Sequence, residues 1–142
     1  MNNLTTVDFE DQTSQDFAPG QTFTSNGVHF SLLPGTEAPM SIRSSSGTHV
    51  NGQVLVVRSG TVDIHPSQAP KSFSFWYTNA DKGLIVSFLA QDGSIITEIH
   101  VPPREGGEKE FNHTLERTFT TARVKVPAND VLIDRLQFTE SR

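Results

Sequence analysis

Residues 84–100 read LIVSFLAQDGSIITEIH, and this stretch decides the fold class. LIVSFLA (84–90) and IITEIH (95–100) are short runs rich in β-branched and aromatic residues, and the turn sequence QDGS lies between them. Two such runs around a turn that contains glycine predict a β-hairpin. We therefore expect antiparallel β-structure in the middle of the chain.

Similar runs continue on both sides of this hairpin. The clearest are TTVDFE (5–10), VHFSLL (28–33), VLVV (54–57), TVDIH (61–65), SFSFWY (72–77) and VLIDRLQF (131–138). Asn26-Gly27 and Ser59-Gly60 are tight-turn signals between neighbouring runs. Many short runs separated by turns predict an all-β, antiparallel sandwich of about eight to ten strands. The 142 residues show no repeat and no linker, so we expect one domain over 1–142.

Two segments are less regular. Phe111, Leu115 and Phe119 recur at helical spacing, so a short helix within 108–126 competes with a strand. Residues 35–52 resemble a long loop in which MSIR (40–43) is the one strand-like piece and SSSG (44–47) indicates flexibility. A flexible loop does not hold a nucleophile and its base rigidly, so the serines near His49 do not predict catalysis.

The composition excludes several functional classes. A net charge of −5 with scattered basic residues argues against nucleic-acid binding. The absence of cysteine excludes disulfides and thiolate metal sites. The nucleophile elbow, the phosphate loop, the dinucleotide fingerprint and the paired-histidine zinc motif are all missing. We expect a protein that is not an enzyme and that binds no organic cofactor.

The location of the protein is open. No run approaches the roughly 20 apolar residues that a membrane span needs. MNNLTTVDFED lacks the basic start and apolar run of a signal peptide. We expect a cytoplasmic protein unless it is exported without a leader or a leader was trimmed.

Asp134 stands in an apolar row of the last predicted strand, with Leu132 and Leu136 on the same face if alternation is unbroken. An unpaired buried carboxylate is costly, so Asp134 needs a partner. Ion pairs with Arg123 or Arg135, and hydrogen bonds from backbone amides, are two possibilities.

A bound cation is the third possibility for Asp134. Terminal strands of antiparallel sandwiches are often neighbours, which would bring Asp134 close to Asp8, Glu10 and Asp11. Clustered carboxylates repel one another, and a cation, an arginine or protonation can compensate them. Calcium fits such a site because it accepts six to eight oxygen ligands in loose geometry.

Three motifs together resemble the galactose-binding-like β-sandwich, or jelly roll, of many carbohydrate-binding modules. They are VDFED (7–11), SFSFWYTNADKGLIVSFLAQDGSIITEI (72–99) and VLIDRLQF (131–138). The resemblance implies a structural calcium held by Glu10, by Asp134 and by backbone carbonyls near Gly27. One departure is Arg135, where the family often has a second acid.

The same resemblance implies a lectin-like sugar site. Such sites use an exposed aromatic side chain against the sugar ring, and Trp76 is the only tryptophan. It lies on the face opposite Phe73 and Phe75, so it is either a stacking platform or part of a covered face. The other candidate ligand residues are Asn79, Asp81, Arg43 and His49.

Two further functions compete with glycan binding. A structural or protein-interaction module, such as an assembly or toxin component, would show a large apolar surface patch. A glycosidase-like enzyme would need two carboxyl groups about 5 to 10 Å apart in one cleft.

Overall fold

The computed structural model describes residues 3–33, 40–104, 107–128 and 130–140. Within these ranges the chain forms thirteen strands and no helix, and hence no helix suited to crossing a bilayer. The strands are β1 (Asn3–Val7), β2 (Gln15–Phe17), β3 (Thr22–Ser25), β4 (Val28–Leu32), β5 (Met40–Ser46), β6 (Asn51–Arg58), β7 (Thr61–His65), β8 (Ser72–Thr78), β9 (Leu84–Leu89), β10 (Ile95–Val101), β11 (Lys109–Thr114), β12 (Thr121–Lys125) and β13 (Asp130–Glu140).

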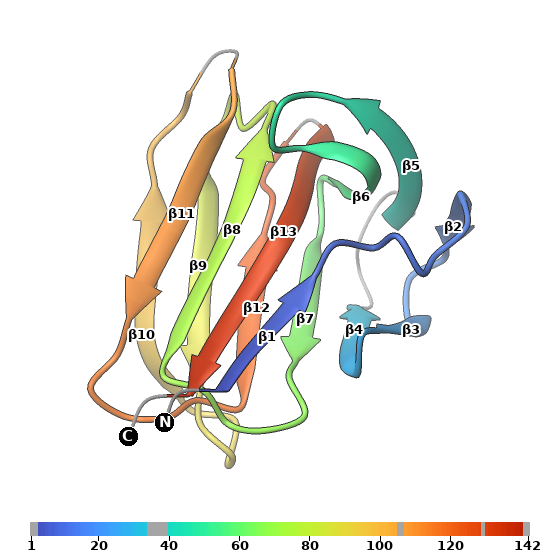
Figure 1. Ribbon diagram of the computed structural model, residues 1–142. Helices are drawn as coiled ribbons and strands as arrows, with labels where there is room; N and C mark the ends of the chain where they lie inside the picture. The colour runs from blue at the N-terminus through green and yellow to red at the C-terminus, as the bar shows by residue number, and fades with distance from the viewer. Residues whose placement is uncertain (1–2, 34–39, 105–106, 129, 141–142) are drawn as a thin grey trace.

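The strands form two antiparallel sheets packed face to face (Figure 1). The front sheet has the order β11-β8-β13-β6-β5-β2, and β1 also pairs with β13. The back sheet has the order β10-β9-β12-β7-β4-β3. This arrangement is the predicted all-β sandwich.

The space between the sheets is filled largely by phenylalanine. Seven phenylalanine rings are almost completely buried: Phe9, Phe30, Phe73, Phe75, Phe88, Phe119 and Phe138. Phe73 of β8 stacks on Phe138 of β13 with ring centroids 4.7 Å apart, and Phe88 of the back sheet meets Phe73 edge to face. Burying each such ring contributes roughly 1.5–3 kcal/mol, so the core needs no disulfide.

The two ends of the chain lie side by side. β1 pairs antiparallel with β13 in a register that joins Thr5 to Phe138 and Val7 to Leu136. β6 pairs with the other half of the same edge of β13, from Asp130 to Ile133. Asp134 and Arg135 therefore lie in the gap between β6 and β1. The predicted adjacency of the terminal strands is confirmed.

The gap contains a β-bulge. The pairing of β13 with β8 shifts register between Asp134 and Gln137, and Arg135 has a φ of 53°. One extra residue on β13 breaks the strict alternation expected from the sequence. Asp134 therefore shares the outer face with Leu132, whereas Leu136 and Phe138 face the core.

Several local expectations need correction. The segment 108–126 contains β11 and β12 and no helix, because Phe111 faces the core from β11 while Leu115 and Phe119 lie in the following loop. Ser44, Ser45 and Ser46 belong to β5 and pair with residues 51–53 of β6. The described residues form thirteen strands and not eight to ten. Short polar strands such as β2 have no alternating apolar pattern and are recognised only by their pairing with a neighbouring strand. The β9–β10 hairpin is present as predicted.

Candidate functional site

The outer face of the front sheet carries the main candidate site. Cross-strand partners share a face, so the register defines rows of side chains on this surface. Glu110, Trp76 and Asp134 form the first row across β11, β8 and β13. The next rows are Asn112, Ser74, Gln137 and Thr6, and then Thr114, Ser72, Thr139 and Leu4.

Trp76 is stacked against His49. The two ring centroids are 3.7 Å apart and the planes are inclined by only 5°. Trp76 is half-buried because it also packs against the small apolar cluster of Val50, Val54 and Val56. It is therefore neither an open platform nor a core residue, and the exposed aromatic surface belongs to the His49–Trp76 pair.

Glu108 holds His49 in this position. Its carboxylate accepts hydrogen bonds from the His49 amide at 2.9 Å and the Val50 amide at 2.7 Å, and lies 3.2 Å from His49 Nδ1. Although desolvation opposes it, these donors keep the pKa of Glu108 below its usual value. Gly47 lies so close that an added Cβ would come within 2.3 Å of the Glu108 carboxylate. The turn between β5 and β6 is therefore built around Glu108.

Two more carboxylates hold the next amides of the same segment. Asp134 accepts from the Asn51 amide at 3.1 Å, and Glu10 accepts from the Gln53 amide at 2.8 Å. The three acids come from different parts of the chain and converge on residues 49–53, which curve over the end of the front sheet (Figure 1). We call this segment, which comprises the end of the β5–β6 turn and the first three residues of β6, the clamped loop.

The clamped loop covers Asp134, whose side chain is only 1% exposed. Burial raises the pKa of the Asp134 carboxyl to about 7, and the neighbouring Glu10 carboxylate adds to this rise. The amides of Arg135, at 2.8 Å, and Asn51 act in the opposite direction. Among the described residues, the hydrogen-bond donors to Asp134 are therefore backbone amides, and the positive charge of Arg135 also lowers the pKa of the Asp134 carboxyl. Arg123 instead forms a bidentate pair with Asp63, at 2.7 and 3.0 Å.

The predicted calcium ligands are only partly brought together. Glu10 and Asp134 interact electrostatically and hold the same loop. Asp8 is exposed and accepts from the Glu10 amide at 3.2 Å. Gly27 is exposed in the β3–β4 turn, with a φ of 77°, and no hydrogen bond joins it to the acid pair in the described part of the chain. Within the same described ranges, no three His, Asp or Glu side chains form a ready metal cluster.

The other predicted ligand residues lie outside the His49–Trp76 pair. Arg43 of β5 forms an ion pair with Asp16, and this pair sits beyond the β6 edge of the site. Asn79 is exposed, with a φ of 68°, and Asp81 is exposed in the turn that follows β8. Only His49 and Trp76, of the five candidates, contact each other.

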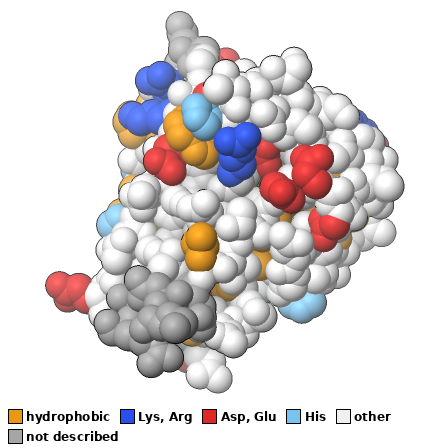
Figure 2. All heavy atoms as spheres, in the orientation of Figure 1, with side chains coloured by type: hydrophobic (Ala, Val, Ile, Leu, Met, Phe, Trp, Pro, Cys, Tyr) orange, Lys and Arg blue, Asp and Glu red, His pale blue; other side chains and the backbone are white. Residues whose placement is uncertain are grey.

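Sequence reasoning missed a band of uncharged polar side chains on this face. Its members are Ser72, Ser74, Asn112, Thr114, Gln137 and Thr139, and we call it the polar strip. The strip runs beside Trp76 over β11, β8 and β13, and Asn112 and Gln137 are exposed. Figure 2 shows a hydrophobic patch and a histidine on this face, with one cluster of acidic side chains to the right of the patch. The alternation in SFSFWY predicts that Ser72 and Ser74 share the face of Trp76, but the residues that β11 and β13 add to this face depend on strand pairing.

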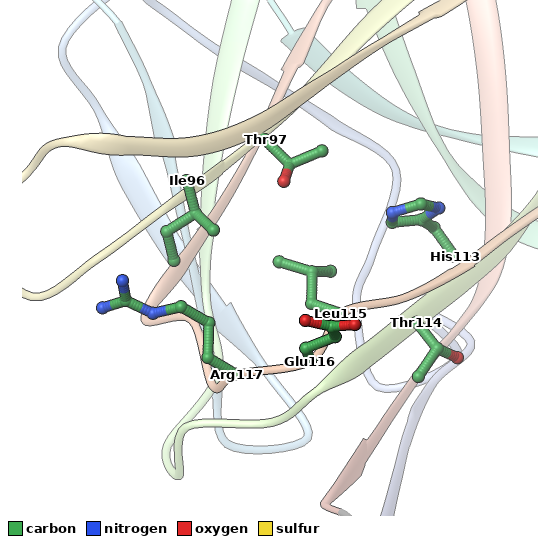
Figure 3. A pocket seen from close by; sticks show the side chains of 7 residues that line it. All are labelled: Ile96, Thr97, His113, Thr114, Leu115, Glu116 and Arg117. Atoms are coloured by element: carbon green, nitrogen blue, oxygen red, sulfur yellow. The ribbon is translucent and has the colours of Figure 1, made fainter.

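A separate pocket of about 310 Å³ opens between β10 and β11, the edge strands of the two sheets (Figure 3). Ile96 and Leu115 supply apolar surface, and Thr97, His113 and Arg117 supply polar groups. This volume is at the lower end of small-molecule sites. None of the ligand residues predicted from the sequence lines it.

Comparison with known proteins defines the fold. No family model and no curated protein matches the sequence. A variant of the carbohydrate-binding module CBM29-2 is similar, with a TM-score of 0.59, 11% identity, and coverage of 89% of this chain and 91% of that chain. A second variant, complexed with mannohexaose, has a TM-score of 0.55 and 13% identity over 98% of this chain and 92% of that chain.

A lectin domain is also similar. A mutant of the lectin binding domain of Lectinolysin, complexed with Lewis b, has a TM-score of 0.50 and 12% identity over 76% of this chain and 94% of that chain. At these identities the likeness establishes the fold alone. The chain has the β-sandwich fold of carbohydrate-binding modules, which confirms the resemblance drawn from its three motifs.

Proposed function

We propose that this domain is a non-catalytic carbohydrate-binding module. Its glycan would lie along the polar strip of the front sheet and contact the exposed edge of the His49–Trp76 pair. The observation that carries the proposal is the juxtaposition of an aromatic pair with a band of amides and hydroxyls on an open sheet face. Sugars present apolar ring faces and many hydroxyl groups, and this surface offers a complement to both.

The structural neighbours support the same ligand class, since two of them are complexed with mannohexaose and with Lewis b. The carboxylates near the site favour binding over catalysis. Glu10, Glu108 and Asp134 each accept backbone amides of the clamped loop, so their role is to hold the chain.

Calorimetric titration with mannohexaose, cellohexaose and Lewis b tests the proposal. We expect at least one of these glycans to bind, and Trp76→Ala to weaken it tenfold or more. Ile95→Ala is the matched control, because Ile95 is an exposed apolar residue of the back sheet. A glycan that binds Trp76→Ala and the unmodified protein equally would place the site elsewhere, for example in the β10–β11 pocket.

We also propose a structural calcium at Glu10 and Asp134. The carboxylates of Glu10 and Asp134 repel each other, and this repulsion favours a divalent cation between them. Backbone carbonyls would supply the further oxygen ligands. Calcium would stabilise the fold roughly as RT ln(1+[L]/Kd). The test is thermal unfolding with calcium or chelator: the melting temperature should rise with calcium, and Asp134→Asn should abolish the rise.

A protein-interaction module is the less favoured alternative. Leu4 and Ile95 are the large hydrophobic side chains exposed among the described residues, and they belong to different sheets. They do not build one apolar patch of the size that partner surfaces show. Light scattering that reveals a stable oligomer would favour the alternative.

A further inference from the structure

The outer face of the back sheet carries a symmetrical row of four side chains. Thr24 pairs with His29 across β3 and β4, and His29 pairs with His65 across β4 and β7. The register of β7 with β12 places Thr121 beside His65. Two neighbouring histidines are thus flanked on both sides by threonine.

Each threonine hydroxyl is bonded to the imidazole next to it. Thr24 Oγ1 lies 2.6 Å from His29 Nδ1, and Thr121 Oγ1 lies 2.9 Å from His65 Nδ1. Both Nδ1 atoms therefore point outward along the row, away from the other histidine. Because the two nitrogens of an imidazole point in divergent directions, each Nε2 atom lies on the side of its ring away from the threonine.

These Nε2 atoms are available as ligands. Neither accepts nor donates a hydrogen bond within the part of the chain that the structure describes. When Nδ1 carries the ring proton it donates to the threonine oxygen, and Nε2 keeps its lone pair. A hydrogen bond from the second ring nitrogen is the usual support for a metal-binding histidine.

We propose that His29 and His65 form a surface site for a divalent transition-metal ion such as Cu²⁺ or Zn²⁺. Directly opposite residues of an antiparallel pair have Cβ atoms about 4.5–5.5 Å apart, which allows one ion to bridge two imidazoles. Imidazole suits copper and zinc, whereas calcium prefers oxygen. Water fills the remaining positions.

Neighbouring charges leave this site nearly neutral. Asp63 is the acid of the adjacent row, and both of its oxygens are bonded to Arg123. Asp63 is therefore engaged by Arg123 and does not serve as a third ligand to the ion. The affinity comes from the two Nε2 atoms, so each histidine is expected to be indispensable.

Titration of the intact protein with CuCl₂ and ZnCl₂, in chelator-free buffer with excess calcium, tests the site. We expect one Cu²⁺ per chain, two imidazole nitrogens in its electron paramagnetic resonance spectrum, and no displacement by calcium. His29→Gln and His65→Gln should each weaken binding at least tenfold and leave one coupled nitrogen. Both positions are on the surface, so folding is checked by an unchanged melting temperature.

Two further variants complete the experiment. His100→Gln is the matched control, because His100 lies on the same sheet at the β10 edge and its Nε2 is bonded to Glu98. It should bind copper as the unmodified protein does. Thr24→Val keeps both ligands but removes one Nδ1 partner, and should weaken binding about tenfold. The proposal fails if either single histidine variant binds normally, or if His100→Gln weakens binding equally.

Discussion

The ring of His49 lies face to face with that of Trp76, with the ring centroids 3.7 Å apart. The Glu108 carboxylate holds His49 there by contacts with the His49 amide and with His49 Nδ1. The three residues come from the β5–β6 turn, from β8 and from the segment before β11. The exposed aromatic surface of the front sheet therefore depends on a hydrogen-bond network around one carboxylate. The first two predictions test that network.

Glu108→Ala should free the clamped loop. It removes the acceptor for the His49 and Val50 amides, which costs roughly 1–3 kcal/mol when a donor stays buried. Urea denaturation measures this loss. Trp76 is the only tryptophan, so its fluorescence should also change as His49 leaves its ring. Glu116→Ala, an exposed acid of the β11–β12 loop, should leave both readouts unchanged.

Gly47→Ala should destabilise the same turn. A Cβ at this position would lie 2.3 Å from Glu108 Oε2 and 2.7 Å from the Val50 carbonyl oxygen. The backbone oxygen cannot move aside cheaply, so we expect a loss of about 1–3 kcal/mol in the free energy of unfolding. Ser46→Ala, one residue earlier and exposed, is the control. Equal stability of the two variants would contradict the close packing of Gly47.

Asp134 should make stability depend on pH between about 4 and 7. Its pKa is about 7 in the folded protein and 3.8 is the ordinary value, so the folded state binds more protons in this window. Its contribution is therefore complete below pH 4 and is lost as the pH rises through 7. Urea denaturation across this range, in chelator, should show a decline that Asp134→Asn removes.

Other acids act in a lower pH range and can be separated from Asp134. The pKa values of Asp11, Asp16 and Glu108 are lowered, so their stabilisation is lost on acidification below their usual range. The difference between the pH profiles of the unmodified protein and Asp134→Asn gives the contribution of Asp134 between about pH 4 and 7. An identical pH profile for this variant would show that another group titrates there.

The polar strip should contribute to glycan affinity. Gln137→Ala and Asn112→Ala each remove an exposed amide beside Trp76, and a lost hydrogen bond of this kind costs about 0.5–1.5 kcal/mol, or up to about tenfold in Kd. Calorimetry with a bound glycan measures the change. Thr97→Ala, in the β10–β11 pocket, should have no effect if the strip is the site. The reverse pattern would move the glycan to the pocket.

Much of the fold followed from local pattern. The adjacency of the first and last strands was expected because the terminal strands of antiparallel sandwiches are often neighbours. The sandwich itself was predicted from alternating apolar residues in SFSFWY and VLIDRLQF and from the turn in LIVSFLAQDGSIITEIH. These features are readable because side chains alternate along a strand and turns need particular residues. The bulge at Arg135 escaped this reading, since an inserted residue changes no pattern until the partner strand is known.

The candidate site was only half visible. Trp76 and His49 were each singled out, but their contact, the role of Glu108 and the polar strip were not. Glu108 receives an amide 58 positions away, and Asp134 receives one 83 positions away. The amino-acid sequence by itself determined that the chain forms an antiparallel sandwich and that Trp76 lies on the face opposite Phe73 and Phe75. The tertiary structure alone decided which outward residues meet, because strand pairing sets contacts between distant segments and no local propensity encodes them.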